Sequence, residues 1–456
     1  MTSLFIFRRD YRLDDNLGLI KACIDSTVVY PIFIITPEQT SDSNKFRSLN
    51  SIQFLTESLK DLQKQLNGKL AIYYGDNLEI IKRLIKAHKI TNVYFNKDYT
   101  PYAINRDKDI TKECDTLGSQ VIMEEDYTLT KLDSVKTGAD TGYTMFTPYM
   151  NKAKKQKVPD PVKFKKVWEN KLKLIEKENQ IDRLERLYTE NVNINVRGGR
   201  TNALEILKHA KDFDKYHLER NNLTYQTTHL SAYIKFGCVS IREIYHDFMK
   251  KIPASSSFFN ELYWHDFYAQ AVYFYPDVLT KKVLDDRFGD IKWEGDRSHF
   301  KRWCVGLTGF PIVDAGMRQL NTTGFMHNRA RMIVASFLVK TLLCDWKLGE
   351  KYFASKLVDY DPCSNVGGWL WVAGGGFDSQ PYFRIFNPWM QAEKFDENCE
   401  YIKKWIPELK NVPVKDIHNW NETCEDYLAG GVKYSKPIVD YSKKRIEALD
   451  MYKKYM

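Results

Sequence analysis

The sequence predicts an α/β domain with a parallel β-sheet, followed by a larger all-helical domain. Over residues 1–130, short apolar runs rich in β-branched and aromatic residues alternate with helical stretches, which is typical of a parallel sheet covered by helices. From residue 201 onward, apolar runs of helical length show little strand-like alternation. We therefore expect domains at residues 1–130 and 201–456, joined by a connector at residues 131–200.

Five strands and two helices are predicted in the N-terminal domain. The helices are expected around residues 47–66 and 77–88. The polar turn FRRDYRLDDN follows the first strand, at the edge where parallel sheets bind ligands. No GxGxxG pattern follows that strand, so the dinucleotide-binding fingerprint is missing. The strands are expected at SLFIF, TVVYPIFII, LAIYYG, NVYFN and SQVIME.

The connector differs in composition from both domains. Its stretch NKAKKQKVPDPVKFKKVWENKLKLIEK is rich in lysine and contains two prolines, which indicates a segment lying partly on the surface. A run of lysines is more often a solvated face than a dedicated binding site.

Two segments of the C-terminal part carry the clearest helical patterns. In GLTGFPIVDAGMRQL, a tight turn precedes a helix on which Asp314 and Arg318 have i,i+4 spacing for an ion pair. In NRARMIVASFLVKTLLCDWK, Asn328 is the predicted helix N-cap. The run from Met332 to Cys344 is almost entirely apolar, so this helix is predicted to be buried.

The same helix begins with two arginines. Arg329 and Arg331 lie in its first turn, where the helix dipole disfavours cations. An anion is therefore expected nearby, either the carboxylates Asp359 and Asp361 of LVDYDP or a ligand phosphate. A purely structural salt bridge explains the arginines equally well.

Bulk composition describes an ordinary globular protein with a small positive excess. The 456 residues are 43% hydrophobic and 28% charged, and the formal net charge is +9, which permits a polyanionic partner without requiring one. The eight cysteines show no CxxC or Cys/His cluster, so no metal site is predicted and reduced thiols in an intracellular compartment, cytoplasm or nucleus, are expected. No stretch approaches the roughly 20 apolar residues of a membrane span.

Aromatic residues stand out, because Phe, Tyr and Trp make up 14% of the chain. In ELYWHDFY, Glu261, Trp264, His265 and Tyr268 share one helical face. Core packing explains a tryptophan there, but a carboxylate on the same stripe needs a partner. In CSNVGGWLWVAGGG, two tryptophans lie between glycine clusters, so large rings stand where the backbone carries the fewest side-chain atoms.

Four stretches, taken together and in this order, resemble the photolyase/cryptochrome family of flavoproteins. They are FRRDYRLDDN, TGFPIVDAGMRQL, NRARMIVASFLVKTLLCDWK and WLWVAGGGFDSQPYFRIFNP. The resemblance covers essentially the whole chain and is nearest to the class I enzymes that repair cyclobutane pyrimidine dimers. It implies a Rossmann-like antenna domain, a helical domain holding U-shaped FAD, and UV-damaged DNA as the partner of a monomeric protein.

Matching positions to the family implies a set of FAD-binding residues. Hydroxyls and backbone amides of one segment would hold the phosphates and ribitol, Asn365 would face flavin N5, and Arg331 would pair with Asp359. The full set is Tyr216, Thr227, Thr228, Leu230, Ser231, Asn328, Arg331, Asp359, Asp361 and Asn365.

The resemblance also implies the residues of repair. Glu261 would hydrogen-bond the damaged base, Trp264 and Trp371 would flank the flipped-out lesion, and excited FADH⁻ would donate the electron that splits it. A tryptophan chain would run from Trp369 through Trp346 to Trp303 at the surface. DNA contacts are expected from Arg220, Glu261, Trp264, His265, Arg329, Met332 and Trp371.

Alternatives within the family are a (6-4) photolyase and a cryptochrome-type photoreceptor. Met332 stands where (6-4) enzymes carry a catalytic histidine, and only 47 residues follow Leu409, too few for the long tail of many cryptochromes. His265 replaces an arginine usual in the family. The antenna pigment is expected to be methenyltetrahydrofolate or 8-hydroxydeazaflavin, and the sequence does not discriminate between them.

Overall fold

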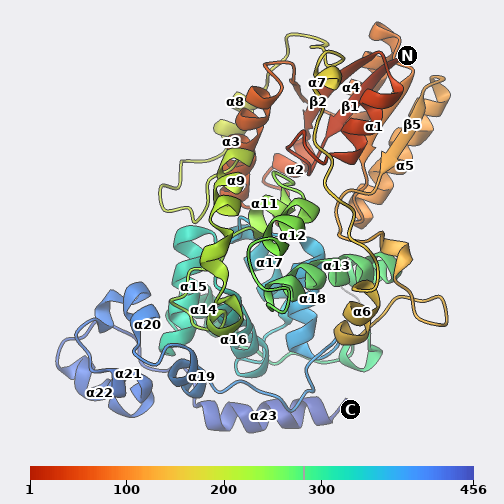
Figure 1. The fold of residues 1–456 in the computed structure, drawn as a ribbon. Coiled ribbons are helices and arrows are strands. Elements are labelled where there is room, and N and C mark those ends of the chain that lie inside the picture. Colours follow the sequence, from red (N-terminus) through yellow and green to blue (C-terminus); the bar gives the residue numbers. More distant parts are fainter. Residues whose placement is uncertain (281–282, 456) are drawn as a thin grey trace.

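The computed structural model describes residues 1–280 and 283–455, and it has two parts (Figure 1). The N-terminus lies in the α/β part and the C-terminus at the far end of the helical part. This arrangement confirms the predicted fold class.

The α/β part is built on one parallel five-stranded sheet with the strand order β3-β2-β1-β4-β5. All five predicted strands are present. Strand order reverses between β1 and β4, so the turns that follow these two strands flank a crevice at the carboxyl edge of the sheet. The strands are β1 (Thr2–Phe7), β2 (Val28–Ile35), β3 (Ala71–Tyr74), β4 (Asn92–Asn96) and β5 (Gln120–Glu124).

Helices cover both faces of this sheet. Successive side chains of each strand point in opposite directions, so each face presents its own apolar side chains to the helices. Phe5 and Phe7 pack into a cluster with α1 and α3, whereas Leu4 and Ile6 pack with α4 and α5. The two predicted helices correspond to α3 and α4. The helices are α1 (Leu17–Asp25), α2 (Pro37–Thr40), α3 (Leu49–Gln65), α4 (Asn77–His88) and α5 (Pro101–Thr116).

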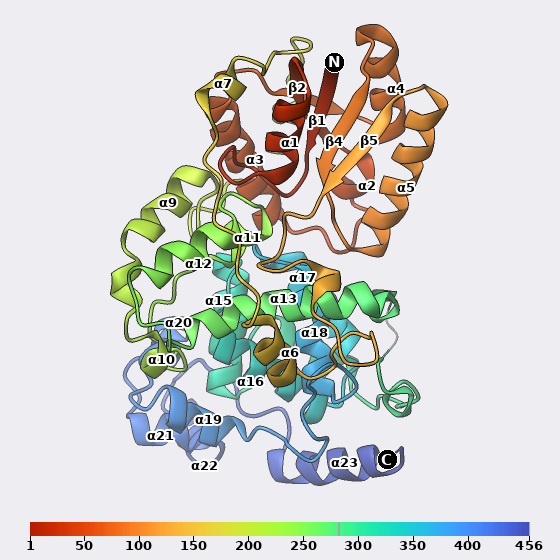
Figure 2. The same cartoon turned by 45° about the vertical axis from the view of Figure 1, so that its right-hand side comes forward.

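The connector contributes to both parts. Leu172 and Asn179 form isolated parallel bridges with Val29 and Ile72 of the sheet, while α6 packs against α13 of the helical part (Figure 2). Its elements are η1 (Leu132–Ser134), α6 (Phe146–Ala153), α7 (Lys166–Glu169) and α8 (Ile181–Glu185).

The helical part surrounds α16, which contacts α15, α17 and α18. The predicted apolar run is helical only as far as Lys340, because Thr341 ends the helix and Leu343 adopts a left-handed conformation with φ 53°. The helices are α9 (Arg200–Lys208), η2 (Ala210–Phe213), α10 (Tyr216–Glu219), α11 (Ser231–Lys235), α12 (Ile241–Met249), α13 (Phe258–Phe274), η3 (Pro276–Thr280), η4 (Asp286–Phe288), α14 (Arg297–Cys304), α15 (Pro311–Thr323), α16 (Asn328–Lys340), α17 (Trp346–Lys356), α18 (Pro362–Ala373), α19 (Pro388–Phe395), α20 (Glu400–Trp405), η5 (Pro407–Leu409), α21 (Val414–His418), α22 (Trp420–Ala429) and α23 (Tyr441–Lys453).

The ion pair predicted between Asp314 and Arg318 is wrong. Asp314 is fully buried and accepts hydrogen bonds from Thr308 and the backbone N–H of Gly309, so it closes the turn before α15. Arg318 pairs with Glu408, with Nη1 2.9 Å from the carboxylate. The backbone N–H groups of this turn have no helical partner, so they donate to the Asp314 carboxylate.

Buried charges join the two parts. Arg242 of α12 donates from Nε to Asp15 (2.9 Å) and from Nη2 to Asp126 (2.7 Å), and its side chain is 3% exposed.

All eight cysteines are buried and unpaired. Within residues 1–280 and 283–455, no group of three or more His, Cys, Asp or Glu side chains could hold a metal ion, and no helix has the length and hydropathy of a membrane span.

Candidate functional site

The arginine–carboxylate pair expected near α16 is present. Arg331 Nη2 lies 2.9 and 3.1 Å from the two carboxylate oxygens of Asp359. Ser231 Oγ donates to the same carboxylate at 2.7 Å. Asp359 therefore links the start of α16 to the start of α11.

The residue that caps α16 is His327, not Asn328 as predicted. His327 Nδ1 accepts from the backbone N–H of Arg329 at 3.1 Å, and Asn328 is the exposed first residue of the helix. Burial, reinforced by Arg329 and Arg331, lowers the pKa of His327 to about 4. A neutral ring keeps the lone pair that the cap requires.

Asp361 has different partners from Asp359. Its Oδ1 accepts from the backbone N–H of Ser364 at 3.0 Å and so caps α18. Its Oδ2 accepts from Arg9 Nη2 and from the Tyr127 hydroxyl, both at 2.6 Å. Arg9 and Tyr127 come from the α/β part, and no sequence signal pointed to them as neighbours of this carboxylate.

One face of α18 borders open space next to these carboxylates. Asn365 is partly exposed and donates to the Glu350 side chain at 3.2 Å. Gly368 lies one turn later on the same face, and a Cβ added there would meet no atom within 4 Å. Gly367 faces Tyr268 instead, with its added Cβ 2.2 Å from that ring, so a larger residue would not fit between α13 and α18.

Hydroxyl groups gather near the start of α11. Thr227 and Thr228 are partly exposed and Ser231 is exposed, whereas the Leu230 side chain is buried, so only the backbone of Leu230 can reach a ligand. Tyr216 is also partly exposed and packs edge-on against Phe258 at 5.7 Å.

These groups fit FAD. Hydroxyls and backbone N–H groups suit phosphate and ribitol, the Asn365 amide suits a polar ring edge, and the unfilled side of Gly368 leaves room beside it. The individual binding assignments made from the sequence stay predictions.

On α13, Glu261 and Trp264 lie on the predicted face, and both have neighbours. Glu261 pairs with Arg220, and both side chains remain about one-third exposed, at 32% and 37%. Burial raises the pKa of Glu261, and Arg220 opposes the rise. Phe146 of α6 stacks on Trp264 with ring centroids 3.7 Å apart; this contact was not predicted, because α6 lies in the connector.

The His265 side chain is mostly buried. It is 14% exposed, its ring lies 4.5 Å from that of Tyr127, and Nδ1 is 3.4 Å from Asp266. The DNA contact expected of His265 stays a prediction.

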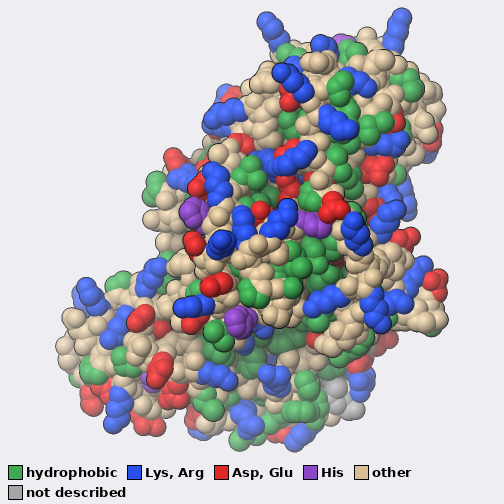
Figure 3. All heavy atoms as spheres, viewed as in Figure 1, with side chains coloured by type: hydrophobic (Ala, Val, Ile, Leu, Met, Phe, Trp, Pro, Cys, Tyr) green, Lys and Arg blue, Asp and Glu red, His purple; other side chains and the backbone are tan. Residues whose placement is uncertain are grey.

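The remaining predicted DNA residues lie on the helical part. Arg329 donates to Asn221 Oδ1 at 2.7 Å and lies 4.4 Å over the Phe395 ring, rather than against Asp359 or Asp361. Met332 and Trp371 are partly exposed. Figure 3 shows a hollow with hydrophobic side chains on this face of the molecule and Lys and Arg side chains around it.

The expectation that Trp303 lies at the surface is wrong. Trp303 is 0% exposed and lies edge-on against Trp369 at 6.3 Å, so it does not reach the surface. Trp346 is 3% exposed. Trp293 is partly exposed. The segment that contains it lies against the segment that leads into Trp346, because a Cβ added to Gly295 would lie 2.5 Å from Cys344 Sγ.

Comparison with known proteins agrees with this geometry. Residues 3–166 match the family described as DNA photolyase, and residues 258–454 match the FAD binding domain of DNA photolyase. The deoxyribodipyrimidine photo-lyase of Escherichia coli is 33% identical over 99% of this chain and 98% of its own length.

Solved structures agree as well. An archaeal photolyase from Sulfolobus tokodaii, solved with two FAD molecules, superposes with a TM-score of 0.89 and 36% identity over 100% of both chains. A class III photolyase from Agrobacterium tumefaciens gives a TM-score of 0.91 and 32% identity over 100% of this chain and 97% of its own. From its opening strand to its last helices, this chain belongs to the DNA photolyase family of FAD-binding flavoproteins.

Proposed function

We propose that this protein is a deoxyribodipyrimidine photo-lyase, which uses blue light to split cyclobutane pyrimidine dimers in UV-damaged DNA. The observation that carries the proposal is the position of Glu261. This carboxyl lies on α13, which packs on α18 beside the open face of Asn365 and Gly368, and it is held by Arg220. A carboxyl group at this position can form a hydrogen bond with a pyrimidine base.

Bound FAD in its reduced form supplies the light-excited electron donor. The residues of the chain hold and orient both ligands. Ser231 and Asp359 line the start of α11, Asn365 offers an amide, and Trp264 and Trp371 offer aromatic faces to the extruded bases. Met332 cannot transfer a proton, which supports dimer repair rather than (6-4) repair.

A repair assay with FAD-loaded protein and an oligonucleotide containing one dimer tests this function. Glu261→Ala is expected to lower the repair rate roughly 10²-fold, because it removes a hydrogen-bonding acid. Glu205→Ala is the matched control, since Glu205 is 58% exposed on α9. Absence of light-dependent repair by the wild-type protein with FAD bound would contradict the proposal.

We infer that the tryptophan route ends at Trp293 rather than Trp303. Trp369 and Trp346 are buried, and Trp293 is the partly exposed ring beside the segment that leads into Trp346. Light-driven reduction of bound FAD is expected to slow at least tenfold in Trp293→Phe, about 1.4 kcal/mol of barrier. Trp303→Phe should stay within twofold, and the opposite ranking would sink the inference.

We further propose a second, light-harvesting pigment. The Sulfolobus tokodaii neighbour, with its two FAD molecules, makes a second flavin a candidate beside methenyltetrahydrofolate and 8-hydroxydeazaflavin. Chromatography of pigments released from the purified protein would identify it, and recovery of one FAD per chain and nothing else would argue against it.

A further inference from the structure

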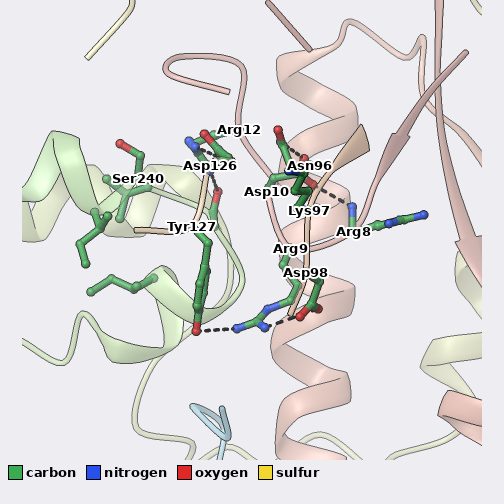
Figure 4. Close-up of a pocket in the computed structure, with 14 residues that line it drawn as sticks. Arg8, Arg9, Asp10, Arg12, Asn96, Lys97, Asp98, Asp126, Tyr127 and Ser240 are labelled. Atoms are coloured by element: carbon green, nitrogen blue, oxygen red, sulfur yellow. Dashed lines mark hydrogen bonds and ion pairs between the residues drawn. The ribbon is translucent and has the colours of Figure 1, made fainter. Parts of the chain in front are cut away.

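Arg9 joins four groups from both parts of the molecule. Its Nε donates to the Lys235 backbone oxygen at 3.1 Å. Its Nη2 donates to the Tyr127 hydroxyl at 3.0 Å and to Asp361 at 2.6 Å, and Nη1 lies 3.5 Å from Asp98. Figure 4 shows the guanidinium between Tyr127 and Asp98, with Arg8 pointing away from it. Each nitrogen of the guanidinium therefore has a partner.

A crevice lies next to Arg9, between the ends of β1 and β4 and residues 237–241. The four contacts of Arg9 are all with groups of the protein itself, and the partner that caps α18 is Asp361.

Asp361 passes the effect of Arg9 to α18. The carboxylate is buried, at 6% exposed, and its two oxygens hold Ser364 on one side and Arg9 with Tyr127 on the other. Asn365 follows immediately and presents its side chain beside the open face of the helix. The orientation of this first turn is thus set by two residues of the α/β part.

Arg9, Asp361 and Lys235 also influence one another's charge. Burial, the largest single influence, would raise the pKa of Asp361, but Arg9, His265, the Tyr127 hydroxyl and the Ser364 N–H together hold the pKa well below the usual range, so the carboxylate is ionised. Burial, aided by Arg9, lowers the pKa of the neighbouring Lys235 to about 7. At pH 8.5 Lys235 is therefore mostly neutral, and Arg9 is the cation that balances Asp361.

We propose that Arg9, supported by Tyr127, is a positioning residue for the flavin: it fixes Asp361 and the first turn of α18, and it balances the carboxylate charge beside the flavin ring. This inference rests on the proposed function, because it requires FAD at the open face of α18. An unbalanced carboxylate opposes the addition of electrons to a nearby ring, so Arg9 is expected to raise the reduction potential of the bound flavin.

The test is the midpoint potential of bound FAD at pH 8.5, measured by spectroelectrochemistry. Arg9→Gln is expected to shift it to more negative values, and Arg9→Lys to restore most of it, because the charge returns without the planar fork. Tyr127→Phe should give a smaller negative shift. Arg8→Gln is the matched control, since Arg8 points away from Arg9, pairs with Asp107 of α5 at 2.7 Å and lies 3.7 Å over the Phe95 ring.

The outcomes separate this inference from the proposed function. If the wild-type protein does not retain FAD, both fail. If FAD is retained and Arg9→Gln leaves the potential where Arg8→Gln leaves it, the positioning role alone is overturned. If Arg9→Gln does not fold, Tyr127→Phe decides, and a wild-type potential in that variant overturns the positioning role.

Discussion

Two aspartates of one loop, Asp359 and Asp361, find their arginines in different regions of the molecule. Asp359 pairs with Arg331, 28 residues earlier and within the helical part. Asp361 pairs with Arg9, 352 residues earlier and in the α/β part. The first pair was implied by the resemblance to the family, since the arginines at the start of α16 left either aspartate or a ligand phosphate as the partner. The second pair was not expected.

Buried ion pairs as well as apolar contacts join the two parts. The apolar cluster that contains Phe5 continues into the helical part, where Phe54 of α3 stacks on Phe236 with ring centroids 4.9 Å apart. At the boundary, Arg242, Arg12 and Arg200 are buried with acidic partners. Buried ion pairs depend on complete partnering, since removal of one member leaves an uncompensated charge. The boundary should therefore be more sensitive to single substitutions than the surface.

The largest effect is expected for Arg242→Met. It removes the cation shared by Asp15 and Asp126, which are 1% and 5% exposed, and should lower the free energy of unfolding by about 3–5 kcal/mol. Urea unfolding followed by tryptophan fluorescence measures it. Lys163→Met is the control, because Lys163 is 80% exposed in its pair with Asp14 and should change stability by less than about 1 kcal/mol. Equal effects would break the contrast between boundary and surface.

The next effect is a pH dependence inside the helical part. His327 is neutral in the folded state, with a pKa of about 4 against 6.5 for the ordinary group. The neutral ring therefore contributes fully to the free energy of unfolding above pH 6.5. This free energy falls by up to about 3 kcal/mol as the pH falls toward 4 and the unfolded state binds the proton first.

His327→Asn should keep the cap and remove that loss, because an asparagine oxygen can accept from the Arg329 N–H. The measurement is the urea midpoint of both proteins at pH 7 and pH 4.5. A variant that loses as much stability as the wild type on acidification would exclude His327 as the cause.

A smaller effect should come from the backbone contact at the boundary. Gly237 has φ +60°, and a Cβ there would lie 2.1 Å from the Arg9 carbonyl oxygen. Gly237→Ala should cost about 1–3 kcal/mol through this clash, in addition to about 1 kcal/mol of backbone strain. Gly118→Ala is the matched control, because Gly118 has φ +74° with no atom within 4 Å of an added Cβ. Unfolding midpoints that fall equally would rule out the clash.

The sequence by itself determined the local elements and the family. The five strands and the helices α3 and α4 follow from side-chain periodicity, and the family follows from four motifs, each continuous in the chain. Even the errors within one segment were small: α16 has its cap one residue earlier than predicted and its end at Lys340 rather than Cys344. Such features depend on neighbours within a few residues, which the sequence displays directly.

Only the tertiary structure decided which distant groups meet. Contacts between segments far apart in the chain place Phe146 on Trp264 and bond Arg9 to Asp361. Packing between elements also decides exposure: it buries Trp303 and most of His265 and leaves Trp293 partly exposed. The physical reason is that side-chain exposure and charge pairing depend on how whole elements pack. Periodicity along one element carries no information about which residue of another element will lie against it.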